Sequence, residues 1–174
     1  MTKYICLDKT KFSLLDFINL SNEDAIFALK IRNHPDVRSN MHNSEIIELD
    51  DHLWFIKTLS QKKDIKYFLV KDNNVCLGVI NYKSIDDNLK KCEFGIYSNL
   101  ESDYPKKGYS LIRIAKNFAA NSLNLKEMYL EVFSDNVRAL NLYKKNGFIE
   151  FNSQARKKNE IIMMKCKLKN KIND

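Results

Sequence analysis

The loop at residues 105–110 has the composition of a phosphate-binding turn. It leads directly into a predicted helix and has the sequence Pro105-Lys-Lys-Gly108-Tyr-Ser110. The first turn of a helix carries unpaired N–H groups and a partial positive charge, so it can bind phosphate. Gly108 lets a ligand approach the backbone closely, and the two lysines add positive charge. An ordinary helix start with solvated lysines has the same composition, so the segment alone leaves both interpretations open.

A second segment places polar side chains on a short predicted helix. Asn136 stands at its start, Tyr143 lies further along it, and Gly147-Phe148 follow its end. The spacing between Asn136 and Tyr143 is about two helical turns, so both side chains share a face. A tyrosine hydroxyl in that position can act as a proton donor. A tyrosine that packs against a sheet, with its hydroxyl in water, fits the pattern as well.

Two histidine-containing segments flank the connection between the first two predicted helices. They are Arg32-Asn-His-Pro35 and His52-Leu-Trp-Phe-Ile56. Arginine and protonated histidine bind anionic groups such as phosphate. His34 can equally cap a helix, and His52 can be a surface residue in a first helical turn. His42, which lies between the two segments, has a weaker claim to a site.

Hydrophobic periodicity predicts the helices around these segments. Ser21 and Asp24 resemble a capping box, which opens a helix that stops near Asn33 because a proline follows. Asp50 is expected to cap a second helix that runs to about residue 61. Trp54, within that helix, is expected in the core or against a loop. Further helices are predicted over residues 109–122 and 135–145.

Strand-forming residues predict a sheet between and after these helices. The predicted extended segments are residues 3–18, 65–71, 75–82, 91–97, 128–133, 148–151 and 161–168. The segments between 65 and 97 are expected to form an antiparallel meander. Gly78 and Gly95 interrupt two of these strands, which is typical of a bulge or of a close approach by a ligand. The element order predicts an α+β (mixed α/β) protein with helices on a mixed sheet.

Composition limits the class of protein. At 174 residues the chain is expected to be one domain, and its net charge of +7 favours an anionic partner. No apolar run approaches the roughly 20 residues of a membrane span, and the first residues do not resemble a secretory signal. The four cysteines form no C-x-x-C pair, so no zinc site is expected. They are predicted to be reduced core thiols of a cytoplasmic protein.

Together with Glu93-Phe-Gly-Ile-Tyr97, the segments at 105–110 and 136–148 resemble the GCN5-related N-acetyltransferase (GNAT) superfamily over nearly the whole chain. The resemblance implies a GNAT fold, in which a mostly antiparallel twisted sheet of about seven strands is flanked by about four helices. It implies one acetyltransferase domain over residues 1–174, with acetyl-CoA as cosubstrate and no metal. In that family a strand bulge parts two neighbouring strands, and the pantetheine arm of acetyl-CoA lies in the gap.

The resemblance also implies roles for individual residues. The usual pyrophosphate-binding turn is Gln/Arg-x-x-Gly-x-Gly/Ala, from which this chain departs at Pro105 and Ser110. Backbone N–H groups do most of that binding, so the turn is expected to work. Tyr143 is implied as the general acid for the departing thiolate, and Glu93 as the base, directly or through water; a surface carboxylate is the alternative for Glu93. The implied coenzyme contacts are Phe94, Gly95, Ile96, Lys106, Lys107, Gly108, Tyr109, Ser110, Asn136 and Tyr143.

The acceptor end is similar to one branch of the superfamily, on the segments Arg-Asn-His-Pro, His-Leu-x-Phe-Ile, Tyr-Phe-Leu-Val and Leu-Gly-Val-Ile. That branch acetylates the 4-amino group of a UDP-linked 4-amino-4,6-dideoxy sugar in pseudaminic acid biosynthesis for flagellar glycans. The resemblance therefore implies a nucleotide-sugar substrate. The implied substrate contacts are Arg32, His34, His52, Asn81, Lys83 and Tyr97.

Three other functions remain open on the sequence. A ribosomal-protein-type N-terminal acetyltransferase shares the Arg-Asn-x-Pro segment and the coenzyme site. An aminoglycoside acetyltransferase is weakly disfavoured, because cationic acceptors favour an acidic cleft and this chain is basic. A non-catalytic RNA-binding module on the same fold is disfavoured because the basic residues are scattered, without interleaved exposed aromatics. We expect no nucleic-acid or membrane partner, and a monomer or homodimer.

Overall fold

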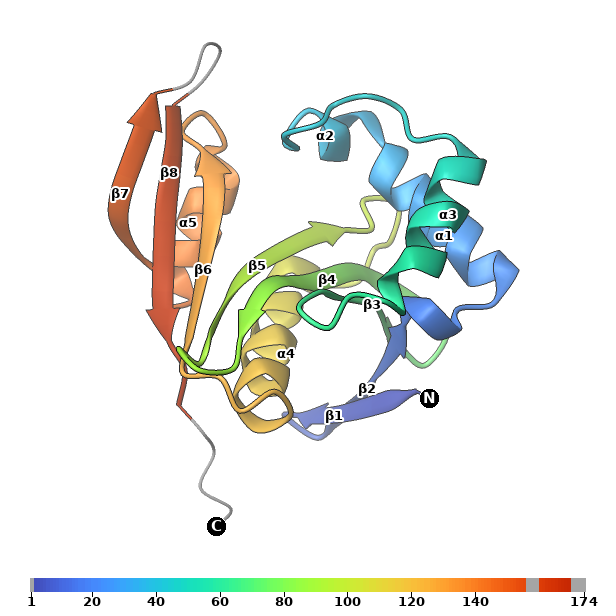
Figure 1. The fold of residues 1–174 in the computed structure, drawn as a ribbon, viewed down its shortest axis with the longest axis horizontal. Helices are drawn as coiled ribbons and strands as arrows, with labels where there is room; N and C mark the ends of the chain where they lie inside the picture. Colours follow the sequence, from blue (N-terminus) through green and yellow to red (C-terminus); the bar gives the residue numbers. More distant parts are fainter. Residues whose placement is uncertain (1, 156–159, 170–174) are drawn as a thin grey trace.

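The computed structural model describes residues 2–155 and 160–169, which form one eight-stranded sheet with helices on both faces (Figure 1). The strands are β1 (Lys3–Leu7), β2 (Thr10–Asp16), β3 (Lys66–Asp72), β4 (Val75–Asp86), β5 (Lys91–Ser98), β6 (Glu127–Phe133), β7 (Ile149–Ala155) and β8 (Glu160–Lys167). The helices are the 3-10 helix η1 (Phe17–Asn19), α1 (Asn22–Asn33), α2 (Pro35–Arg38), α3 (Leu49–Leu59), α4 (Lys107–Asn121) and α5 (Val137–Lys145). The mixed α/β architecture is as predicted, with one strand and one α-helix more than expected.

The strand order is β1-β2-β3-β4-β5-β6-β8-β7. Neighbouring strands are antiparallel except β5 and β6, which run parallel. The predicted meander is confirmed, because β3, β4 and β5 pair in sequence order. Figure 1 shows two halves of the sheet, one formed by β1–β5 and the other by β6, β8 and β7. The halves meet where β5 and β6 lie together, low in the view, and they diverge above that point.

The two faces of the sheet pack against different helices. Ile80 and Tyr82 of β4 belong to a core cluster that includes residues of α4 and α5, and the buried Tyr82 hydroxyl donates to the Ala115 carbonyl (2.9 Å). Val79, which directly precedes Ile80, belongs to a second cluster that includes Ile31 of α1. Because both faces of β4 are covered, its sequence is an almost unbroken apolar run instead of an alternating one.

Local capping signals predicted several helix ends correctly. The Ser21 side chain accepts a hydrogen bond from the Asp24 N–H (3.1 Å), and α1 ends at Asn33. Gly147, at φ +81°, follows α5 in the left-handed conformation expected there. Each of these signals lies within a few residues of the helix end that it marks, so it can be recognised from the sequence alone.

The N-terminal segment predicted as continuous extended chain is a hairpin instead. Strands β1 and β2 are antiparallel, and the turn between them contains Asp8 (φ +48°) and Lys9 (φ +69°). Hairpin turns of this kind usually contain glycine, and an aspartate followed by a lysine is only a weak sequence signal for one. Residues 17–19 then form the helix η1.

Two expectations for α3 are wrong. The helix starts before Asp50, and its N-cap residue Glu48 makes no side-chain capping bond. Trp54 was placed in the core or against a loop, yet 69% of it is exposed. The buried stripe of α3 contains His52 and Leu59, and Trp54 lies off that stripe, so it points into solvent.

The cysteines divide into a buried set and one exposed residue. Cys76, Cys92 and Cys166 are buried, and burial raises the pKa of each thiol, to about 11 for Cys76 and Cys166 and about 12 for Cys92. These three are free core thiols, as predicted. Cys6 is exposed, because it lies on the outward-facing side of β1, so the prediction of four core thiols is wrong for this residue.

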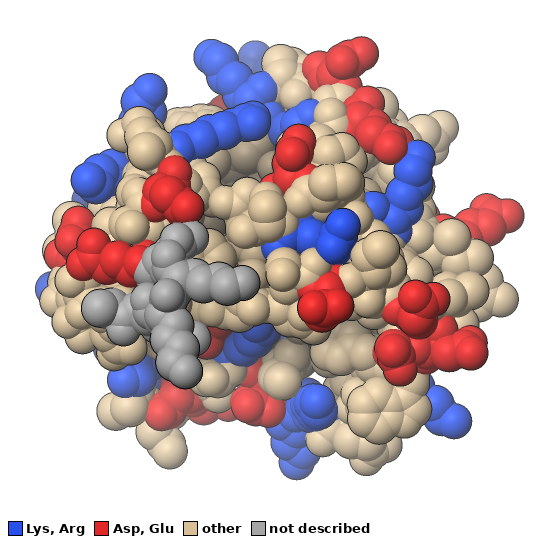
Figure 2. Space-filling view, turned by 90° about the horizontal axis from the view of Figure 1, so that it is seen from above, with Lys and Arg blue, Asp and Glu red and all other residues tan. Residues whose placement is uncertain are grey.

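The surface shows no single basic patch on the face viewed in Figure 2. Lys and Arg side chains are interspersed there with Asp and Glu. Within the described part of the chain, no helix has the length and apolar character needed to cross a bilayer.

Gly78 fixes the approach of β4 to the end of β5. Its φ is +147°, and a Cβ at this position would lie 2.3 Å from the Tyr97 carbonyl oxygen and 2.8 Å from the Ser98 Cα. Both contacts are with backbone, which cannot move aside as a flexible side chain can. The bulge between Val70 and Lys71 of β3 lies next to this point.

We predict that Gly78→Ala lowers the free energy of unfolding by about 3 kcal/mol, because a left-handed backbone strain and a backbone clash combine. Gly147→Ala is the matched control, since its φ of +81° is strained while its Cβ would meet only the Lys116 Nζ at 3.8 Å. It should lose about 1 kcal/mol. Urea unfolding followed by circular dichroism measures both values, and equal losses would show that the close approach of β4 and β5 is unimportant.

Candidate active site

The parting of β5 and β6 creates the candidate site. The two strands pair only at their lower ends, where Lys91, Cys92 and Glu93 face residues 127–129. Beyond Glu93, β5 continues to pair with β4 and β6 with β8, so their facing edges have no strand between them (Figure 1). A free strand edge presents unpaired N–H and C=O groups. The gap can therefore bind an extended ligand that carries amide groups, as an added strand would.

A buried amide lies beside this edge. Asn81 of β4 is the register partner of Gly95, and a Cβ on Gly95 would lie 2.8 Å from the Asn81 Nδ2. Gly95 therefore leaves the space that the Asn81 side chain fills. Asn81 is only 7% exposed, and within the described residues its amide forms no hydrogen bond. A buried amide without partners is available to a ligand.

Opposite charges lie where the gap begins. Lys83 and Glu93 are register partners on β4 and β5, and the Lys83 Nζ lies 3.9 Å from the Glu93 Oε1. Both side chains are more than one third exposed, so the pair is held weakly. Burial, with the nearby Glu93 charge, raises the pKa of Tyr67 to about 12. Glu93 thus combines access to water with a position at the last paired residue of β5.

A half-buried arginine faces the same side of the sheet. The Arg32 Nη2 donates to the Asn43 carbonyl (2.7 Å), whereas its Nη1 is buried with no hydrogen-bond partner in the described structure. Burial lowers the pKa of Arg32, and the neighbouring Tyr97 and Tyr67 hydroxyls raise it. A buried guanidinium donor without an acceptor is costly, so this position suits an anionic or polar ligand group.

The other two residues predicted to bind substrate lie elsewhere. His52 is 4% exposed, its Nε2 lies 3.1 Å from the Ala25 carbonyl oxygen, and its ring packs edge-on against Phe17. Burial lowers the pKa of His52, so the ring is neutral and joins α3 to α1. The side chain therefore has a structural position between α1 and α3.

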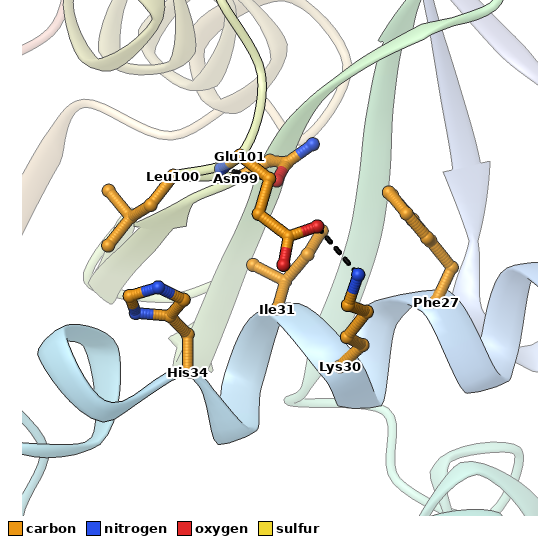
Figure 3. Close-up of a pocket in the computed structure, with 7 residues that line it drawn as sticks. All are labelled: Phe27, Lys30, Ile31, His34, Asn99, Leu100 and Glu101. Atoms are coloured by element: carbon orange, nitrogen blue, oxygen red, sulfur yellow. Dashed lines mark hydrogen bonds and ion pairs between the residues drawn. The ribbon is translucent and has the colours of Figure 1, made fainter.

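His34 is the N-cap of α2. Its Nδ1 accepts from the Asp36 N–H (3.2 Å), and its ring lines a small hollow with Leu100 and Glu101 (Figure 3). The hollow lies beyond the end of β5, about 20 Å along the strand from Glu93. The structure therefore brings four of the six predicted substrate residues onto one face of the sheet: Arg32, Asn81, Lys83 and Tyr97.

The predicted phosphate-binding turn forms the start of α4. Lys106 precedes the helix in the left-handed conformation (φ +52°), and the Ser110 N–H donates to the Lys106 carbonyl (3.0 Å). The N–H groups of residues 107–109 have no acceptor within the helix, so they are free to bind a ligand. A Cβ on Gly108 would lie 2.9 Å from the Leu142 Cδ2, so glycine lets α4 pack closely against α5. Tyr109 is exposed at this end.

Lys107 does not extend toward solvent from this helix start. Its ammonium donates to the Ser102 carbonyl in the loop between β5 and α4. The charge predicted for phosphate binding is therefore used to brace the loop, and Lys107 contributes its backbone N–H to the site.

Tyr104 is a positioning residue that sequence reasoning missed. Its hydroxyl donates to the Asp72 Oδ2 at the end of β3 (2.9 Å), and its N–H donates to the Ser102 Oγ (3.2 Å). Burial and the Asp72 carboxylate raise the pKa of Tyr104 to about 12. Asn99 anchors the same loop, because its N–H donates to the Leu77 carbonyl (2.9 Å) and its Nδ2 to the Cys76 carbonyl (3.2 Å). The β3–β4 hairpin thus holds the turn that precedes α4.

Two residues predicted to contact the coenzyme, Asn136 and Tyr143, lie at the start of the short helix α5 and within it. The Asn136 Oδ1 accepts from the Ala139 N–H (3.1 Å), so Asn136 caps the helix and keeps its Nδ2 group for other contacts. Tyr143 is buried and packs edge-on against Phe148, with ring centroids 5.6 Å apart. Burial raises the pKa of Tyr143 well above its usual value, so the hydroxyl keeps its proton and can donate it.

A gap with free strand edges beside unpaired amide donors at a helix start suits an extended cosubstrate that carries amide and phosphate groups. A family model for the GNAT acetyltransferase domain matches residues 15–149, and the chain belongs to this family. It is an N-acetyltransferase with acetyl-CoA as cosubstrate. The predicted family and GNAT fold are confirmed.

The chain is similar to the acetyltransferase PseH from two strains of Campylobacter jejuni. It is 36% and 34% identical to them over 135 residues, which cover 78% of this chain and 83% of each relative. The crystal structure of Campylobacter jejuni N-acetyltransferase PseH in complex with acetyl coenzyme A matches with a TM-score of 0.72 and 28% identity, covering 90% of this chain and 98% of that one.

A spermidine N-acetyltransferase from Vibrio cholerae, solved with CoA and spermine, has a TM-score of 0.81 at 21% identity. The match covers 93% of this chain and 98% of the spermidine N-acetyltransferase. At that identity the match shows a shared fold alone. In the described residues, no group of three His, Cys, Asp or Glu side chains is placed to hold a metal ion.

We predict that Tyr104→Phe raises the KM for acetyl-CoA about tenfold, because the turn before α4 loses its hydrogen bond to a carboxylate. The KM for the acceptor and kcat should change less than twofold. Initial-rate kinetics with either substrate varied measure the two KM values. Tyr4→Phe, at an exposed tyrosine of β1, is the control. An unchanged KM for acetyl-CoA would show that the Tyr104–Asp72 bond does not position the turn.

Proposed function

We propose that this enzyme acetylates the 4-amino group of a UDP-linked 4-amino-4,6-dideoxy sugar, the reaction expected in pseudaminic acid biosynthesis. The observation that carries the proposal is the buried Arg32 Nη1, which has no hydrogen-bond partner among the described residues and lies near Tyr97 and Tyr67. A nucleotide sugar supplies anionic and hydroxyl acceptors for that donor. The similarity to the PseH acetyltransferases supports the same class of acceptor.

Acetyl-CoA is proposed to bind from the open edge of β5. Backbone groups of residues 94–96 hold the pantetheine arm, the N–H groups of residues 107–109 hold the pyrophosphate, and Lys106 and Ser110 border it. The Asn136 Nδ2 contacts the arm near Tyr143. Strands β1 and β8 belong to the same sheet although they lie outside the matched residues, which supports one acetyltransferase domain over residues 1–174.

The proposed reaction is direct transfer between two bound substrates. The sugar amine gives up a proton to Glu93, directly or through water, and attacks the thioester carbonyl carbon. A backbone N–H on the free edge of β5 stabilises the oxyanion. The oxyanion then collapses as the C–S bond breaks, and the CoA thiolate takes the proton from the Tyr143 hydroxyl. The phenolate regains a proton from water, and Glu93 releases the amine proton to solvent. Lys83, paired with Glu93, and Asn81 line the acceptor side of this path.

A panel of acceptors tests the proposal. The enzyme is incubated with acetyl-CoA and, separately, a UDP-4-amino-4,6-dideoxy sugar, a ribosomal-protein N-terminal peptide, an aminoglycoside and an RNA. We expect mass spectrometry to show one added acetyl group on the nucleotide sugar. Acetylation of the peptide alone would instead identify an N-terminal acetyltransferase, and RNA retention without transfer would identify a binding module.

The panel includes Arg32→Gln to link the activity to the proposed site. This variant should raise the KM for the nucleotide sugar at least tenfold, because a charge-assisted contact is lost, and leave the KM for acetyl-CoA unchanged. Arg38→Gln is the matched control, since the Arg38 Nη1 also donates to a loop carbonyl, that of Ser44. Equal effects of the two variants would mean that Arg32 supports the loop and not the substrate.

We predict that Tyr143→Phe lowers kcat about 100-fold with little change in the KM for acetyl-CoA, because the variant cannot protonate the thiolate. The raised pKa of Tyr143 keeps the hydroxyl in its active, protonated form as the pH rises. The kcat of the unmodified enzyme should therefore not fall through Tyr143 ionisation below about pH 10. Tyr82→Phe, at a tyrosine that is also buried, is the control and should lose stability but keep kcat.

A further inference from the structure

The loop between α2 and α3 is held in place by hydrogen bonds to residues of α1 and α2. Residues 39–48 contain no helix or strand. The Arg32 Nη2 donates to the Asn43 carbonyl, the Arg38 Nη1 donates to the Ser44 carbonyl (2.6 Å), and the Asn33 side chain accepts from the Ile47 N–H (3.0 Å). These bonds hold the middle and the end of the loop against the helices, and His42 directly precedes the two residues held at their carbonyls, Asn43 and Ser44.

The loop contacts the other half of the sheet through His42. The His42 Nε2 lies 3.1 Å from the Glu131 Oε2, and the His42 ring meets the Phe133 ring edge-on, with centroids 5.7 Å apart. Glu131 and Phe133 belong to β6, beyond Tyr129, where the pairing of β6 with β5 ends. Strand alternation puts these three β6 residues on one half-buried face. The contact therefore spans the mouth of the gap.

The strength of this contact suits a reversible closure. The His42 side chain is 54% exposed and the Glu131 side chain 27%, so water and salt screen the pair. An imidazole Nε2–H donates to a carboxylate both in the neutral ring with that tautomer and in the charged ring. An ion pair this exposed holds the loop only weakly.

We infer that His42 and Glu131 form a strap, defined as the contact between loop 39–48 and β6, that closes the acceptor side of the gap between β5 and β6. At the lower end of the gap the two halves of the sheet are joined by the short pairing of β5 and β6. The strap joins them again at the mouth. An acceptor bound on the face of Arg32, Asn81 and Tyr97 lies under the closed loop, so His42 and Glu131 are positioning residues for it.

The role of the strap in acceptor binding rests on the proposed function, whereas the existence of the strap does not. The first test therefore needs no acceptor. Hydrogen–deuterium exchange of a peptide that covers residues 39–48 is compared between the unmodified enzyme, His42→Ala and Glu131→Gln. We expect exchange to be about two- to fivefold faster in both variants, because an exposed ion pair holds the loop that weakly. A peptide of β4 should exchange at its original rate.

Three further variants separate the strap from a general effect of the loop. Glu45→Gln removes an exposed carboxylate from the same loop and should leave the exchange unchanged. His42→Lys keeps a donor for Glu131 and should restore slow exchange. The double variant His42→Ala/Glu131→Gln should exchange no faster than either single variant. Unchanged exchange in both single variants, or additive effects in the double variant, would overturn the strap.

The second test measures the effect on catalysis. With a UDP-4-amino-4,6-dideoxy sugar as acceptor, His42→Ala and Glu131→Gln should raise the acceptor KM two- to fivefold and leave the KM for acetyl-CoA unchanged. If the unmodified enzyme does not turn over this sugar, the proposed function fails and the exchange test still decides whether the strap exists. Faster exchange with an unchanged acceptor KM would overturn the positioning role.

Discussion

The pairing of β5 with β6 stops at Glu93 and Tyr129, and the active site depends on this ending. Each strand keeps a partner on its other side, β4 for β5 and β8 for β6, so the sheet remains stable while two edges stay free. Free backbone groups in a protein interior are costly unless water or a ligand satisfies them. The fold thus has a built-in place for an extended amide-containing cosubstrate.

Close approaches of backbone keep the elements around this gap in place. Gly78 brings β4 against the end of β5, Gly95 leaves space for Asn81, and Gly108 lets α4 pack against α5. The last of these fixes the helix start, with its free N–H groups, next to the upper part of the gap. Side chains complete the support, because Tyr104 ties the intervening loop to Asp72. The geometry of the coenzyme site is therefore a consequence of packing on both of its sides.

Sequence reasoning found the features that local signals encode. The Ser21 cap and the hairpin turns of the meander depend on residues within a few positions of one another. It missed features that depend on distant residues or on unusual turns. The β1–β2 turn contains no glycine, the one-turn helix α2 is too short to show periodicity, and His52 is buried only because α1 and η1 cover it.

The contacts of Tyr104 and His42 also could not be predicted from the sequence. Each joins residues from separate elements, and neither residue type nor spacing distinguishes them from ordinary surface side chains. Lys107 illustrates the reverse case, since its position matched a phosphate-binding lysine while its ammonium braces a loop. Residue type and helix position predicted which backbone N–H groups are left unpaired at the start of α4. Only the folded arrangement determines where a long side chain ends.

Burial also separates the two groups that are proposed to handle protons. Tyr143 lies in the core cluster behind the gap, where burial disfavours the phenolate and keeps the hydroxyl as a donor. Glu93 lies on the opposite face of the sheet, partly exposed and beside Lys83, with water available to carry a proton away. In the proposed mechanism a thioester in the gap has the first group toward its sulfur and the second toward the incoming amine. The parted strands would thus place the proposed acid and base on opposite sides of the bond that breaks.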